Sequence, residues 1–162
     1  MYGQHLKVKN ARRIAGALSR AGIDTSEILF SAAYLCGHPK IDAPQDSVSA
    51  LLSGAEFEIW RLPAGFDGFD PERLGAIPAL GLINALVEDQ TTVEHRVTVG
   101  RMLAVGLFAL AWRKQKKTES AYLTLEWSDG RFQYEAVFAF TGAGAMQAAN
   151  TARNAVLRVV GV

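Results

Sequence analysis

The stretch from residue 91 to residue 140 decides the fold that this sequence predicts. It divides into TTVEHRVTVGRMLAVGLFALAW (91–112), RKQKKTES (113–120), AYLTLEW (121–127), SDGR (128–131) and FQYEAVFAF (132–140). The first, third and fifth pieces have the apolar alternation of strands, whereas the second is a basic loop and the fourth a tight turn. No cofactor or catalytic signature lies in them, so the stretch indicates a sheet and not an activity.

The last two of these strands are predicted to form an antiparallel hairpin. Alternate residues share a face in each strand: Ala121, Leu123, Leu125 and Trp127 in the first, and Phe132, Tyr134, Ala136, Phe138 and Phe140 in the second. Between them, Asp129-Gly130 tolerates the positive φ of a two-residue turn. We therefore expect Leu123, Leu125, Phe138 and Phe140 to be buried.

Two helices are expected at the ends of the chain. From Ala145 to Val160 the apolar positions recur at helical spacing: Met146, Ala149, Ala152, Val156 and Val159. This amphipathic helix is predicted to cover one side of a curved sheet. At the other end, Leu6 to Ala21 has the same period with basic residues around it, and Gly22 is placed to end it.

The segments between the first helix and residue 91 are less regular. Ile28–Cys36 is short and apolar, which predicts a buried strand with a helix as the alternative. Residues 37–53 predict a loop with a short helical turn around residues 47–52. Residues 56–62 alternate and predict a strand with Phe57 and Ile59 inward. The glycine- and proline-rich residues 62–90 predict an irregular acidic excursion, with a short helix over 79–87. Residues 93–99 then alternate as a strand.

Composition places the chain among globular proteins of one domain. Of its 162 residues, 49% are hydrophobic and 20% are charged. The single cysteine, Cys36, excludes an internal disulfide. The longest uncharged apolar run, Met102 to Trp112, falls short of the roughly 20 residues that a spanning helix needs, and the first residues have no apolar core of a secretory leader. We expect a cytoplasmic protein without a transmembrane segment.

Charge is segregated along the chain. Residues 1–20 carry five basic residues and no acid, while residues 41–90 carry nine acids against Arg61 and Arg73. Such asymmetry can steer a charged partner toward the protein, and it can equally bring two parts of one molecule together. Both explanations stay open at this point.

The order of these elements resembles a pleckstrin-homology-like (PH-like) domain of bacterial or phage proteins. The resemblance rests on residues 100–127 and on the alanine-rich residues 148–155, and it extends over about residues 91–160. It implies an α+β fold with an N-terminal helix, an antiparallel curved sheet or partly open PH-like barrel, and a C-terminal amphipathic helix packed on the sheet. The expected single domain, 1–162, then comprises a basic helix (1–22), the sheet (27–140) with its acidic excursion (62–90) and a capping helix (143–160).

Catalytic patterns are weak in this sequence. The three histidines are scattered, no serine lies in a nucleophile elbow, and no glycine-rich stretch carries the lysine of a phosphate loop. Glu56 and Glu58 share one face of a predicted strand, as a catalytic carboxylate pair does, but both can equally face water. We expect no catalytic residues, no cofactor and no metal.

The strongest binding candidates are cations beside aromatic residues. Arg113, Lys114, Lys116 and Lys117 follow Trp112; Trp60, and the pair Arg12 and Arg13 on the first helix, are the other candidates. Exposed tryptophans anchor protein partners, whereas lysine-rich loops meet phosphates or simply keep a sheet edge solvated. We expect a non-enzymatic module that binds a protein. Binding of nucleic acid or an anionic membrane through residues 6–21 and 113–117, self-association, and an unrecognised small enzyme are the alternatives.

Overall fold

The computed structural model describes residues 16, 19–20, 22, 28–61, 70–93 and 119–161. In order along the chain, its elements are β1 (Ile28–Cys36), β2 (Gln45–Ser53), β3 (Glu56–Arg61), β4 (Glu72–Pro78), the 3-10 turn η2 (Ala79–Gly81), β5 (Leu82–Glu88), β6 (Ser120–Ser128), β7 (Gln133–Thr141) and α4 (Ala145–Val160).

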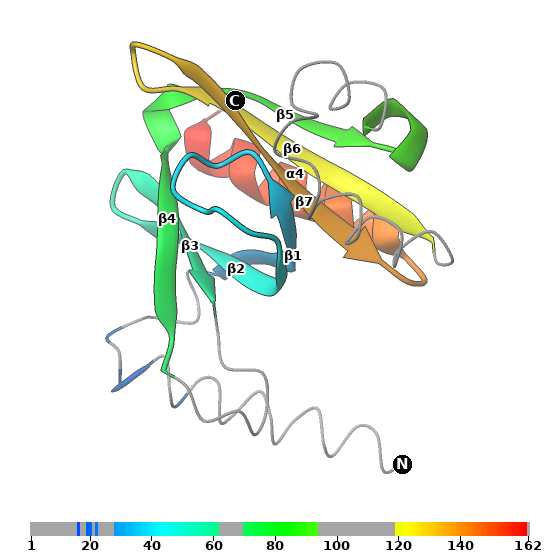
Figure 1. Cartoon of the computed structure of the whole chain (residues 1–162), viewed down its shortest axis with the longest axis horizontal. Helices are drawn as coiled ribbons and strands as arrows, with labels where there is room; N and C mark the ends of the chain where they lie inside the picture. The colour runs from blue at the N-terminus through cyan, green and yellow to red at the C-terminus, as the bar shows by residue number, and fades with distance from the viewer. Residues whose placement is uncertain are drawn as a thin grey trace.

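The strands form one open antiparallel sheet in the order β4-β3-β2-β1-β7-β6-β5. Strands β2 to β4 run across the direction of β5 to β7, and α4 lies along the second group (Figure 1). Because β1 pairs with both β2 and β7, it joins the two halves of the sheet. The edges, β4 and β5, follow one another along the chain through η2.

The main core lies between α4 and the sheet. Phe138 is its centre, with the ring of Phe30 5.2 Å away and that of Tyr34 5.8 Å away, both nearly edge-on. From β3 and β4, Phe57, Ile59 and Ile77 reach the same core, so both halves of the sheet contribute to it. Edge-on aromatic pairs add to the stabilisation that burial of their area gives.

A second, smaller core lies on the other face of the same sheet. It comprises Leu35, Val93, Tyr122, Val137 and Ala139, which come from β1, β6, β7 and the turn after β5. Strands β6 and β7 are therefore buried on both faces, as central strands with cover on two sides must be.

The predicted hairpin and its buried face are confirmed. β6 and β7 pair from Ser120↔Thr141 to Ser128↔Gln133, and Leu123, Leu125, Phe138 and Phe140 are all buried. In the turn, the carboxylate of Asp129 accepts hydrogen bonds from the N–H groups of Phe132 and Arg131 and from the Tyr134 hydroxyl, which lower the pKa of Asp129. Phe132 is 64% exposed, because it lies in this turn before β7 begins.

The predicted C-terminal helix is confirmed over Ala145–Val160. Its buried stripe is Ala145, Ala149, Ala152 and Val156, at the spacing that faces a sheet. The expected burial of Met146 is wrong: it is 42% exposed, because Ala145 occupies the inward position of the first turn. Gly161, with φ 79°, ends the helix in the left-handed conformation that favours glycine.

Two of the earlier predicted strands are also confirmed. β1 spans Ile28–Cys36, and β3 spans Glu56–Arg61 with Phe57 and Ile59 buried. The expected basic helix over residues 6–21 lies almost entirely outside the described residues, as do residues 94–118 of the predicted strand and loop.

The expected α+β fold class is wrong, and the N-terminal helix that it included falls outside the described residues. The part of the chain that the structure describes is mainly β: seven strands in one open sheet, with α4 its only long helix. Strand β2 replaces the expected loop and turn over residues 37–53, and β4 and β5 replace the irregular excursion and the helix over 79–87. Gln90–Val93 forms a helical turn where a strand was predicted to begin. Pairing with neighbours overrides the weak local preference of these segments.

Candidate binding cleft

Strands β1 and β7 separate partway along their length. Their pairing runs from Cys36↔Val137 through Tyr34↔Phe138 to Ala33↔Ala139, and no described pair lies beyond it. Both strands continue, β1 back to Ile28 and β7 on to Thr141, while β1 stays paired with β2 as far as Ile28↔Leu51. The first part of β1 therefore follows β2 away from β7.

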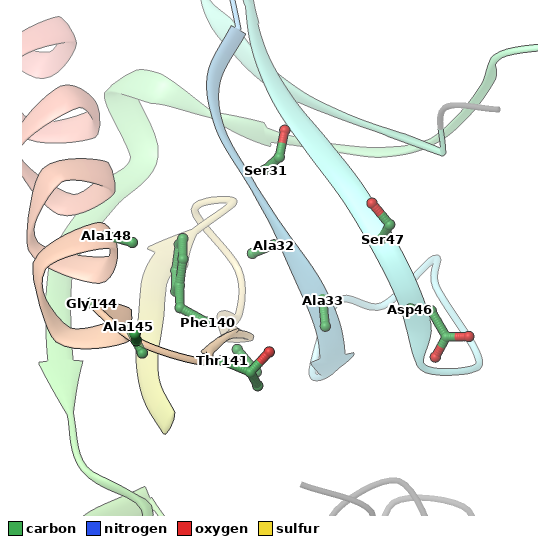
Figure 2. Close-up of a pocket in the computed structure, with 12 residues that line it drawn as sticks. Ser31, Ala32, Ala33, Asp46, Ser47, Phe140, Thr141, Gly144, Ala145 and Ala148 are labelled. Carbon is green, nitrogen blue, oxygen red and sulfur yellow. The ribbon is translucent and has the colours of Figure 1, made fainter. Parts of the chain in front are cut away.

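A cleft of about 310 Å³ lies at this separation (Figure 2). One wall is β1 with the start of β2, and the other is the end of β7 with the first turns of α4. Apart from Phe140, the side chains that line it are small: Ser31, Ala32, Ala33, Asp46, Ser47, Ala139, Thr141, Ala143, Gly144, Ala145 and Ala148. The volume is at the lower end of the range for ligand sites, which begins at about 300 Å³.

The cleft is suited to a peptide backbone. Small side chains let another main chain approach closely, and β1 continues along one wall without a β7 partner. Hydroxyl groups of Ser47 and Thr141 lie on opposite walls. Among the described lining residues Asp46 carries the only charge, so the cleft favours a ligand with a positive group.

The two outer edges of the sheet are protected by side chains. On β5, the backbone carbonyl of Ala85 accepts a hydrogen bond of 2.9 Å from Nε of Arg153 in α4, and the Ala85 N–H donates to Oδ1 of Asn84. On β4, the carbonyl of Ala76 accepts a hydrogen bond of 2.8 Å from Nε2 of His38. Occupied edge groups hinder the addition of a further strand.

His38 is the buried histidine of the described chain, at 6% exposure. It lies in the loop between β1 and β2 and contacts Gly75 and Ala76 of β4 and Trp127 of β6, whose ring centre is 5.4 Å from that of His38. Burial lowers the pKa of His38, as does the charge of Lys40, while the hydrogen bond to Ala76 opposes them.

Of the binding residues predicted from the sequence, only Trp60 is described. It is half-buried, and its Nε1–H donates to Glu58 across 3.0 Å. The indole N–H of Trp60 is therefore bound to a carboxylate of its own strand, β3. Arg12, Arg13, Trp112, Arg113, Lys114, Lys116 and Lys117 lie outside the described residues, so their roles stay predictions.

The carboxylate pair on β3 is an ion-pair site. Arg73 of β4 donates from Nε to Glu58 across 2.9 Å and from Nη2 to Glu56 across 3.2 Å. Arg61 pairs with Glu72 beside them. Both carboxylates share one arginine as their partner, which is the arrangement of a solvated sheet face and not of an acid and base awaiting substrate.

Sequence reasoning missed the cleft. Its lining is mostly alanine and serine from four elements, residue types that carry no motif, and the separation of β1 from β7 is a property of pairing. From the sequence, His38 was interpreted as a loop histidine two residues after Cys36 and as one of three scattered histidines. Its burial depends on β4, which the sequence did not predict.

Comparisons with known proteins bring no relative: no family model, no curated protein and no solved structure matches this chain. Within residues 28–61, 70–93 and 119–161, no group of three or more His, Cys, Asp or Glu side chains could hold a metal ion. None of the helices in the described part is long and apolar enough to cross a membrane.

Proposed function

We propose that this chain is a non-enzymatic protein-binding module that takes an extended segment of a partner protein in the cleft between β1 and β7. The observation that carries the proposal is the end of β1–β7 pairing at Ala33↔Ala139, which leaves strand on both sides of an open cleft. An extended segment can pair with a free length of strand through its main chain, while pockets read its side chains.

The protected edges favour this cleft over other places for strand addition. Arg153 and Asn84 occupy edge groups of β5, and His38 occupies one of β4. Ser31 and Ala32 of β1 line the cleft, and the described pairing of β1 with β7 stops before them, at Ala33↔Ala139. Asp46 at the rim adds a preference for a segment that carries lysine or arginine.

The proposal does not depend on the PH-like resemblance, which stays a prediction. It keeps the expectation of protein binding but moves the site from residues 112–117 to the cleft.

Selection of random linear peptides on the purified full chain tests the proposal. Ala148→Trp fills the cleft from α4, and Asn154→Trp places the same ring on an exposed position of α4 that does not line it. We expect selected peptides to bind the wild type and Asn154→Trp alike and to lose about tenfold or more of their affinity for Ala148→Trp. Far-UV circular dichroism and the melting temperature establish that both variants fold.

A second variant tests the contribution of the Asp46 charge to binding. Asp46→Asn should weaken binding of lysine- or arginine-containing peptides about two- to fivefold, because a rim ion pair contributes little. Peptides that bind Ala148→Trp as tightly as the wild type, or a library from which nothing is enriched, would contradict the proposal.

A further inference from the structure

His38 connects three parts of the molecule that are far apart in the sequence. Its backbone N–H donates to the Tyr34 hydroxyl of β1 across 2.8 Å, its Nε2 bonds the Ala76 carbonyl of β4, and its ring lies on Trp127 of β6. Neither β4 nor β6 pairs with β1 in the sheet. The imidazole therefore links β4, at one edge of the sheet, to β6 in the other half of the sheet.

The hydrogen bonds define the protonation state of this ring. Nδ1 accepts a hydrogen bond of 3.1 Å from the Lys40 N–H, so it carries a lone pair, and Nε2 donates its proton to the Ala76 carbonyl. The ring is the neutral tautomer with hydrogen on Nε2. A second proton on Nδ1 would point at the Lys40 N–H, donor against donor, and that hydrogen bond would be lost.

Among the described residues, the Ala76 carbonyl is the neighbour that favours a charged ring, because it accepts the hydrogen bond from Nε2. β4 presents Gly75 and Ala76 and β6 presents Trp127, none of which ionises; β1 presents the Tyr34 hydroxyl, and the loop itself presents the cation Lys40. Burial is the largest cause that lowers the pKa of His38 below 6.5, and Lys40 lowers it further. A buried charge without a compensating partner is expensive.

The ring also has no room to be hydrated where it is. A methyl group built on Gly75 would come within 2.6 Å of Cε1 of His38, so the imidazole lies directly on the β4 backbone. Once charged, it gains water only by leaving this position. Its departure would free the Ala76 carbonyl on the β4 edge and uncover one face of Trp127.

We propose that His38 is an acid-sensitive latch: while neutral it holds the loop between β1 and β2 (residues 37–44) against the β4 edge and Trp127, and protonation releases it. The device is independent of the cleft. Because the pKa is lower in the closed form, the closed form has its full stability at pH values well above 6.5 and loses stability as the pH falls from 6.5 toward its own pKa. The exposed Asp89 and Asp129, with pKa values below 3.8, titrate in a separate range.

The fluorescence of Trp127 in the full chain tests the latch. The protein has three tryptophans, so Trp60→Phe with Trp112→Phe leaves Trp127 as the reporter. We expect a reversible change in its emission with a midpoint below pH 6.5, and loss of hydrogen-exchange protection at the Lys40 amide with the same midpoint. Far-UV circular dichroism should stay constant, because the strands remain.

Matched variants separate His38 from the other histidines. His5→Gln with His95→Gln should keep the transition, and His38→Gln should abolish it. If His38→Gln does not fold, NMR titration of His38 in the His5→Gln, His95→Gln protein gives its pKa directly. A midpoint at or above 6.5, a transition that survives in His38→Gln, a Trp127 signal that does not follow His38, or a change only on global unfolding would each overturn the latch.

Discussion

Strands β6 and β7 differ from β3 and β4 in how many of their faces are buried. In β6 every residue from Ala121 to Leu125 is buried, and in β7 every residue from Ala136 to Phe140. In β3 and β4 one face packs in the core through Phe57, Ile59 and Ile77, and the other carries ion pairs in contact with solvent.

The difference indicates where the stability of the molecule lies. Burial of apolar area contributes about 25 cal/mol per Å², so strands covered on both faces contribute most. Exposed ion pairs contribute about 0–1 kcal/mol each, so the outer face of β3 and β4 contributes little to the stability of the protein. The two halves of the sheet contact each other through His38 and Gly75, and they separate at the cleft between β1 and β7.

Phe138→Ala should have the largest effect, because Phe138 lies on the core face of β7 between Phe30 and Tyr34. We expect a loss of about 3–5 kcal/mol in the free energy of unfolding, measured by urea denaturation. Phe132→Ala is the matched control at an exposed position and should cost less than about 1 kcal/mol. Equal losses in the two variants would show that β7 is not buried as described.

Gly75→Ala should have the next largest effect, since its methyl group would collide with the His38 ring. Overpacking of this kind costs about 1–3 kcal/mol. In the background of His38→Ala the same change should cost less than about 0.5 kcal/mol, because the imidazole that the new methyl group would meet is absent. Additive losses in this double-mutant cycle, measured by thermal and urea unfolding, would contradict the contact between the two halves.

Arg153→Ala should show that the β5 edge needs its side-chain cover. The loss of one hydrogen bond to the Ala85 carbonyl should cost about 1 kcal/mol. Because that carbonyl becomes available to another chain, we also expect concentration-dependent self-association by analytical ultracentrifugation. Arg158→Ala removes an exposed cation from the same helix and should leave the protein as associated as the wild type. Equal self-association of the two variants would show that Arg153 does not protect the β5 edge.

Arg73→Ala should have the smallest effect of the four, although it removes two ion pairs. Its side chain is 43% exposed, so we expect a loss of about 0–1 kcal/mol that shrinks further in high salt. A loss above about 2 kcal/mol that does not depend on salt would place part of the stability on the outer face of β3 and β4. The outer face of β3 and β4 would then stabilise the protein as buried strand faces do.

The parts that were predicted correctly have strong local signals. Asp129-Gly130 between two alternating runs gives a hairpin with its register, and the spacing of Ala149, Ala152 and Val156 gives the buried stripe of α4. The prediction placed Met146 at the first position of that stripe because methionine is more hydrophobic than the neighbouring Ala145. The backbone placed the smaller Ala145 inward instead.

The parts that were missed have weak local signals. Gln45–Ser53 contains five polar residues, and β4 contains glycine and ends in proline, so neither resembles a strand alone. β4 can hold Gly75 and Pro78 because it is an edge strand, where one side needs no partner. Only the assembled sheet makes it an edge.

The sequence by itself determined the elements whose period and turns are written locally: β1, β3, the β6–β7 hairpin and α4. Tertiary structure alone decided that β2, β4 and β5 complete the sheet, that β1 leaves β7 at Ala33, and that His38 lies between β4 and Trp127. The reason is physical: a hairpin or an amphipathic helix is specified by neighbours in the chain. An edge, a cleft or a buried histidine exists only through contacts between residues far apart in sequence.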